Sequence, residues 1–209
     1  MRLQFRQGGQ TMPLSRREIV GTALVGPLLA SLPGLALADG QGVSAEMRRA
    51  LEARRGWPTA LWLRRLNGEE VFADFRQPDG AWLPAGLVTL SWAMRDYRSG
   101  AAVEINRALF ELLSRLQAGL SQIHGSAVPL VLQSGFRTPE SNANTEGAAR
   151  NSMHLMGQAA DIKVPDFAPN AVAAAAAVVA GGGIGIYPTF THVDVARPRF
   201  WRGEARKGS

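Results

Sequence analysis

The chain has 209 residues with no cysteine, three histidines, 21 arginines against two lysines, and a formal net charge of +6. The lack of cysteine excludes disulfides, thiolate zinc fingers, a cysteine nucleophile and a lipid-modified cysteine, so any metal must be held by histidines and carboxylates. Apolar residues make up 46% and charged residues 19% of the chain, which is the composition of an ordinary globular protein, and the length favours one domain with an extension.

The extension is at the N-terminus, where residues 1–38 are typical of a bacterial export signal. A leader with the pair Arg16 and Arg17 precedes an apolar run, and residues 36–38 read Ala-Leu-Ala, a small-x-small cleavage site. The arginine pair resembles the motif read by the twin-arginine translocase, which carries folded proteins. The run is long enough to be an uncleaved anchor, but its two prolines and three glycines favour cleavage. We therefore expect a periplasmic mature chain, 39–209, with no stable membrane anchor.

Cleavage also changes what the charge implies about partners. The leader contains four arginines and one glutamate, so its removal lowers the net charge from +6 to +3. A charge of +3 spread over a domain is poor support for a phosphate-binding surface, and we expect no nucleic-acid partner. Arginine pairs at 48/49, 54/55 and 64/65 suit an anionic polymer such as a cell wall or, more simply, solvated helix and strand faces.

The distribution of apolar and charged residues divides the mature chain into an Arg-rich linker or helix at 39–59, one domain at 60–203 and a tail at 204–209. No internal repeat is present. The domain opens with two strand-like runs between residues 60 and 75. Asn67-Gly68 separates these runs and supplies the turn that a hairpin requires.

The rest of the domain alternates helical and strand-like segments. Five leucines recur at helical spacing between residues 109 and 120, and we assign them to the core. Residues 140–153 are polar and small, which predicts a surface loop. Without repeated βαβ units, this order indicates an α+β fold. The predicted helices are 86–98, 106–123 and 170–180, and the predicted strands are 128–133, 158–164, 184–187 and 190–195.

Three consecutive glycines, 181–183, follow the last predicted helix. A dinucleotide-binding loop needs a strand before its glycines and a helix after them, and here the order is reversed. We therefore interpret the run as a helix end.

Two short segments carry histidines beside acids. His192 and Asp194 alternate on a predicted strand, so they project from one face. Asp161 lies on another predicted strand; if the two strands pair antiparallel, Asp161 and His192 can meet, and a turn at Gly157 can bring His154 to the same place. Two imidazoles and one carboxylate with an open fourth position are the ligand set of a catalytic zinc site.

Each of these signals has a simpler interpretation. A single histidine is more often a hydrogen-bonded core or surface residue than a ligand, and Asp161 can be a strand-edge charge. The zinc interpretation is favoured because the chain has only three histidines, and two of them lie beside acids on strand-like segments. The third, His124, precedes Gly125 at a predicted helix end, where partial positive charge is favourable.

Four segments together carry a resemblance to a known family. They read Ser134-Gly-Phe-Arg137-Thr-Pro-Glu-Ser-Asn142, Ser152-x-His154-x-x-Gly-x-Ala-x-Asp161, Gly182-Gly-x-Gly-x-Tyr187-Pro and His192-Val-Asp194. Their order and spacing resemble the zinc murein endopeptidases of the lysostaphin, D-Ala-D-Ala carboxypeptidase and hedgehog superfamily, and within it the murein endopeptidase K branch. The resemblance runs from about Leu61 to Trp201.

The resemblance implies a small antiparallel sheet, flanked by helices, that carries a zinc ion on His154, Asp161 and His192. It implies peptidoglycan stem peptides or their cross-links as substrate. Arg137 would point at the substrate, where a guanidinium favours a developing oxyanion or binds a carboxylate. Ser152 would either bind substrate or cap a local turn. A second function class also stays open, a non-catalytic, zinc-stabilised module that binds peptidoglycan.

One position departs from the carboxypeptidase branch of the superfamily. That branch has a glutamate general base three residues before the last zinc histidine, and here Thr189 occupies the position. Asp194 is our candidate for the base, because it shares a strand face with His192. Its alternative role is to accept a hydrogen bond from the second ring nitrogen of that histidine.

Overall fold

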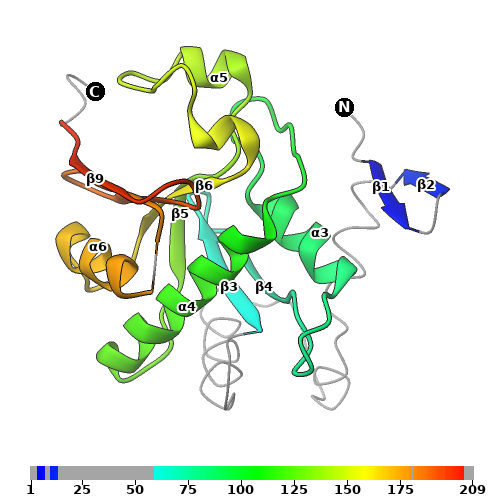
Figure 1. The fold of residues 1–209 in the computed structure, drawn as a ribbon, viewed down its shortest axis with the longest axis horizontal. Coiled ribbons are helices and arrows are strands. Elements are labelled where there is room, and N and C mark those ends of the chain that lie inside the picture. The colour runs from blue at the N-terminus through cyan, green and yellow to red at the C-terminus, as the bar shows by residue number, and fades with distance from the viewer. Residues whose placement is uncertain (1–3, 8–9, 14–58, 180, 205–209) are drawn as a thin grey trace.

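A computed structural model describes residues 4–7, 10–13, 59–179 and 181–204 (Figure 1). The twin-arginine pair, the cleavage site and nearly all of the linker lie outside these residues, so the export signal and the linker stay predictions. Strands β1 (Gln4–Gln7) and β2 (Gln10–Pro13) form an antiparallel pair ahead of the domain. No helix in the described ranges has both the length and the apolar character that crossing a bilayer requires.

A seven-stranded sheet with the order β4-β3-β5-β6-β8-β7-β9 forms the centre of the domain (Figure 1). The predicted α+β class is confirmed, but the sheet is mixed and larger than the small antiparallel sheet that we expected. The pairs β3–β5 and β7–β9 are parallel. The strands are β3 (Ala60–Arg65), β4 (Glu70–Asp74), β5 (Leu130–Ser134), β6 (Ala159–Lys163), β7 (Gly183–Ile186), β8 (Thr191–Asp194) and β9 (Arg199–Arg202).

The strand predictions hold except at the end of the chain. Strands β3 and β4 form the predicted hairpin, with Trp62 opposite Phe72 and a positive φ of 83° at Gly68 in the turn. Strands β5 to β8 match the four later predictions to within two residues at each boundary. Strand β9 was not predicted, because three of its four residues are exposed and the segment shows no apolar alternation.

The helices α3 (Pro84–Ala93), α4 (Arg107–His124) and α6 (Pro169–Val178) confirm the three predicted helices. Helix α3 ends five residues early, because Asp96 accepts hydrogen bonds from the following backbone N–H groups and closes a turn. The predicted loop at 140–153 is wrong at its start: Thr138 caps a short helix, α5 (Pro139–Ala143).

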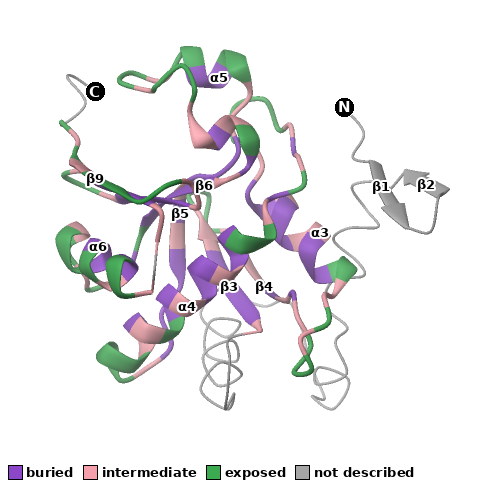
Figure 2. Cartoon of the chain, viewed as in Figure 1, coloured by how far each residue is buried: buried purple, intermediate pink, exposed green. Residues whose placement is uncertain are grey.

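The core lies between the sheet and helices α3, α4 and α6, and α4 also contacts α6 (Figure 1). Leucines of α4 pack with alternate apolar residues of the central strands, among them Leu130, Ile162 and Val193. Figure 2 shows buried positions, in purple, along the central strands and on parts of the helices. Because side chains alternate along a strand, the intervening residues of β6 and β8 point to the opposite face.

The glycine run serves two elements. Gly181 donates its N–H to the carbonyl of Ala176 over 3.0 Å, which confirms a helix-ending role for that residue. Gly183, however, is the first residue of β7, so the interpretation of the whole run as a helix end is wrong.

Candidate metal centre

Strand register brings two of the candidate ligands together. Asp161 of β6 lies directly opposite His192 of β8 in the antiparallel pair, so both side chains leave the same face of the sheet. Asp161 Oδ1 is 2.9 Å from His192 Nδ1. The two residues meet by the strand pairing that the sequence suggested.

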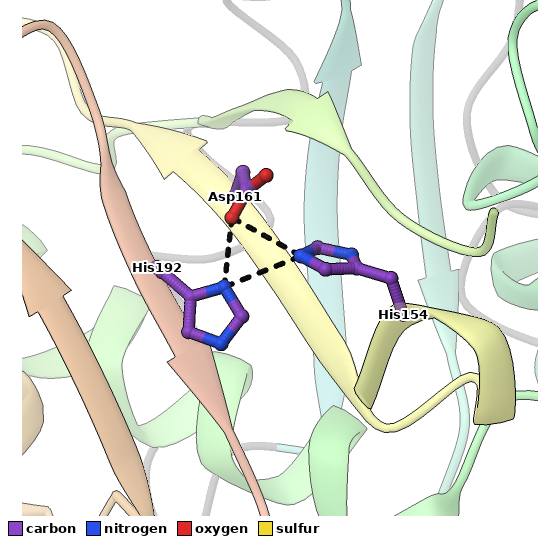
Figure 3. Close-up of side chains that lie close together, drawn as sticks. All are labelled: His154, Asp161 and His192. Carbon is purple, nitrogen blue, oxygen red and sulfur yellow. Dashed lines mark hydrogen bonds and ion pairs between the residues drawn. The ribbon is translucent and has the colours of Figure 1, made fainter. Parts of the chain in front are cut away.

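A turn brings the third candidate to the same point. The 3-10 helix η1 (Met153–Met156) carries His154 and ends at Gly157, whose φ is 63°. Ser152 caps η1 by accepting a hydrogen bond from the His154 N–H at 3.4 Å. This is the capping contact that we considered for Ser152, while a contact with substrate stays a prediction. Figure 3 shows the three side chains converging from η1, β6 and β8.

One atom of each side chain faces the common centre, and these three atoms have the spacing of metal ligands. His154 Nε2 lies 3.2 Å from both Asp161 Oδ1 and His192 Nδ1, and the third separation is 2.9 Å. Bonds of about 2.0–2.1 Å to a tetrahedral zinc ion would place two donor atoms about 3.3 Å apart. All three residues are buried. The donor set therefore fits a metal ion in both chemistry and spacing.

Each candidate ligand is fixed from behind. His154 Nδ1 is 2.6 Å from the Gly135 carbonyl, and because a carbonyl only accepts, the ring proton sits on Nδ1 and the Nε2 lone pair faces the centre. His192 Nε2 is 3.0 Å from Asp194 Oδ2, which leaves Nδ1 to face the centre. The second oxygen of Asp161 pairs with Arg137. These contacts orient all three donor atoms before any metal binds.

The electrostatics favour an ionised carboxylate at Asp161 and act in opposite directions on the two imidazoles. Burial acts to raise the pKa of Asp161, but His154 and His192 outweigh it and hold that pKa well below its usual range. Burial lowers the pKa of His154, which favours the neutral ring that a metal needs. Burial acts in the same direction on His192, but hydrogen bonds with Asp161 and Asp194 outweigh it and raise the pKa of His192.

Arg137 lies at the edge of this cluster. Its Nε donates to Ser134 Oγ over 2.8 Å, and its Nη2 pairs with Asp161. The Arg137 N–H donates to the His154 carbonyl over 3.1 Å. Among the described residues its Nη1 makes no hydrogen bond, so one guanidinium nitrogen has no partner within the described chain.

The turn that carries Arg137 is held from outside the cluster by Asp96, which the sequence did not single out. Asp96 accepts hydrogen bonds from both the N–H and the hydroxyl of Thr138, at 2.8 and 3.0 Å. Burial acts to raise the pKa of Asp96, but hydrogen bonds from Ser141, Thr138 and Arg98 lower it to about 2. A buried acid between two loops was not recognisable in the sequence.

Asp194 and His124 lie apart from the three inward-facing atoms of the candidate ligands. Asp194 is fully buried behind His192 and on the side away from Asp161 and His154. His124 is the last residue of α4, before Gly125, as predicted, and contacts Ser126 and Asp166. Burial acts to raise the pKa of Asp194, but hydrogen bonds from His192 and two backbone N–H groups hold it well below its usual range.

Comparisons with known proteins place the chain beside one group of cell-wall enzymes. The family model described as peptidoglycan L,D-endopeptidase MepK matches residues 56–201. The peptidoglycan L,D-endopeptidase MepK of Escherichia coli strain K12 is 34% identical over 151 residues, which cover 69% of this chain and 80% of that protein. The probable peptidoglycan L,D-endopeptidase MepK of Haemophilus influenzae is 31% identical over 153 residues, covering 70% of this chain and 80% of the relative.

Proposed function

Because this chain belongs to the peptidoglycan L,D-endopeptidase MepK family, we propose that it is a zinc peptidase that hydrolyses stem-peptide cross-links in peptidoglycan. The observation that carries the proposal is the convergence of His154 Nε2, Asp161 Oδ1 and His192 Nδ1 within 3.2 Å of one another. A bound zinc ion would polarise the scissile carbonyl and lower the pKa of its water to about 7.

The chain itself supplies orientation and a positive charge. The Gly135 carbonyl and Asp194 fix the two imidazole rings, so that their lone pairs are aligned with one oxygen of Asp161. Arg137 holds the other oxygen of Asp161 and directs its remaining nitrogen to the substrate. There it stabilises negative charge on the carbonyl oxygen or binds a stem-peptide carboxylate.

The names of the relatives narrow the choice between the two cross-links that the protein could hydrolyse. They are called L,D-endopeptidases, and of the two common cross-links only the direct link between two diaminopimelates joins an L-centre to a D-centre. A link from D-alanine to diaminopimelate joins two D-centres. We therefore take the direct diaminopimelate link as the substrate.

Isolated cell-wall sacculi provide the deciding experiment. The purified protein with one equivalent of zinc should release soluble peptides that end at former cross-links, and defined muropeptides should be cut only at the diaminopimelate–diaminopimelate bond. If zinc is bound and neither substrate is cut, the protein is the non-catalytic wall-binding module instead, and co-sedimentation with sacculi would show it. Cleavage of the D-alanine link alone would reject the assigned bond.

Peptidoglycan as substrate also implies action outside the cytoplasmic membrane. We propose export by the twin-arginine translocase and cleavage after Ala38, on the sequence pattern of residues 1–38. Cell fractionation and N-terminal sequencing test this proposal. The mature protein should begin at Asp39 in the periplasm, and replacement of Arg16 and Arg17 by lysine should leave the full-length chain in the cytoplasm.

A further inference from the structure

Strand β9 places two side chains against the metal centre from across another strand. Asp161, His192, Gly185 and Trp201 are successive partners across β6, β8, β7 and β9. In the neighbouring row, Gly183 of β7 is the partner of Arg199 and donates its N–H to Asp194 Oδ1 over 2.8 Å. We call Arg199 and Trp201 the β9 pair.

The two glycines of β7 leave the space through which the β9 pair reaches β8. A methyl group placed on Gly185 would lie 2.5 Å from Cε2 of the Trp201 ring, and one on Gly183 would lie 2.6 Å from Arg199 Nη1. Neither glycine has a positive φ, so the backbone conformation does not require glycine there. The Gly-x-Gly pattern of β7 is therefore explained by the room it leaves, which alternates with the same period as the strand.

Both side chains of the β9 pair act on the β8 residues of the site. Arg199 Nη2 lies 2.7 Å from Asp194 Oδ2, and Arg199 Nη1 lies 3.3 Å from Asp194 Oδ1. The two residues therefore form a bidentate ion pair. The centre of the Trp201 ring is 5.2 Å from that of His192. The Arg199 guanidinium also lies 5.1 Å from the Trp201 ring centre, so the two members of the pair support each other.

We propose that Arg199 is a positioning residue of the metal centre. It holds the Asp194 carboxylate, which in turn holds His192 with Nδ1 towards Asp161. The inference rests on the metal centre of the proposed function and adds a part that the ligand motif does not contain. Metal-ligating histidines commonly depend on such outer partners, whose loss weakens metal binding by about 10- to 100-fold.

The same contacts assign a positioning role, and not the role of general base, to Asp194. Its Oδ1 accepts from the N–H groups of Gly183 and Ala196 and from Arg199, and its Oδ2 accepts from His192 and Arg199. A carboxylate has about four lone-pair sites, and Asp194 has 0% exposure. No acceptor site is left to take a proton from water at the metal.

The test is the zinc dissociation constant, measured without substrate by competition with a chromophoric chelator. We expect Arg199→Ala to weaken zinc binding by about 10- to 100-fold and Gly185→Ala to weaken it less, by moving Trp201 away from His192. Arg202→Ala is the matched control, because Arg202 is an exposed arginine of the same strand whose side chain makes no hydrogen bond or ion pair within the described residues. Equal zinc affinity in Arg199→Ala and Arg202→Ala would overturn the proposal.

Two further measurements keep the outcome clear. Arg199→Lys keeps the positive charge but cannot form the bidentate ion pair. It should therefore give an intermediate zinc affinity, even if circular dichroism shows that Arg199→Ala folds poorly. Asp194→Asn separates the two roles of Asp194: weaker zinc binding, with activity recovered at saturating zinc, supports positioning, whereas unchanged zinc binding with a lower kcat shows a base. Since zinc binding is measured without turnover, an inactive protein still tests the inference.

Discussion

The two faces of the β6–β8 pair are built from alternate residues of the same strands, yet they serve different purposes. On one face Ala160, Ile162 and Val193 pack into the core. On the other, Asp161 and His192 meet at 2.9 Å. Apolar contact is non-directional and tolerates repacking, whereas the site face depends on which atom of each ring and carboxylate points inward. We expect substitutions one residue apart to separate stability from metal binding.

The largest expected effect is on the site face. His192→Gln removes one ligand while keeping a polar side chain, and we expect zinc to be lost from the purified protein. Muropeptide hydrolysis should then fall by more than about 10³-fold, or about 4 kcal/mol in the activation free energy. Metal analysis and kcat/KM provide the measurements. A zinc-loaded His192→Gln protein would show that this histidine is not a ligand.

The matched change on the core face is Ile162→Ala, beside Asp161 in sequence. Ile162 is fully buried, and its truncation should lower the free energy of unfolding by about 2–5 kcal/mol. Urea unfolding measures the loss. The folded variant should still bind one zinc ion per chain, and a stoichiometric loss of zinc would show that the two faces are not independent.

Zinc bound at the site face should also raise the free energy of unfolding of the whole domain. Binding only to the folded state raises the free energy of unfolding by about 2.7 kcal/mol when free zinc is 100 times its dissociation constant. Thermal unfolding of the wild type with zinc and with a chelator should show this difference. The difference should disappear in His192→Gln and persist in Ile162→Ala.

The smallest effect concerns the turns next to the site face. The pKa of Asp96 is lowered to about 2 in the folded protein, from about 3.9 in an unfolded chain. The stability that Asp96 contributes is therefore fully present above pH 4 and is lost as the pH falls towards 2. We expect Asp96→Asn to lose about 1–2 kcal/mol at pH 7 and little at pH 2.

Urea unfolding at several pH values measures this difference. The exposed Asp79→Asn is the control and should follow the wild-type pH profile. An Asp96→Asn profile parallel to that of the wild type would contradict the assignment.

The parts of the site that local sequence patterns determine could be predicted. Alternation placed Asp161 and His192 on one face, since both strands are short, regular and adjacent in the sheet. The third candidate ligand, His154, required a turn at Gly157 that the sequence also indicated. The placement of these three residues could be predicted because it follows from residue spacing within two short segments of the chain.

The parts that depend on non-local pairing could not be predicted. The contribution of Arg199 requires that β9 pairs parallel to β7 and that Gly183 leaves room between them. Neither fact has a local signal, because an exposed edge strand has no apolar alternation. The mixed sheet was missed for the same reason: the β3–β5 pair joins segments separated by all of α3 and α4.

The turn at Gly135 to Arg137 and η1 are joined by two hydrogen bonds that run in opposite directions. The Arg137 N–H donates to the His154 carbonyl, and the His154 ring donates to the Gly135 carbonyl. These bonds tie Arg137, the proposed substrate-binding residue, to His154, a candidate metal ligand. Binding free energies are reciprocal, so the factor by which a peptide carboxylate on Arg137 changes the zinc affinity should equal the factor by which zinc changes the peptide affinity.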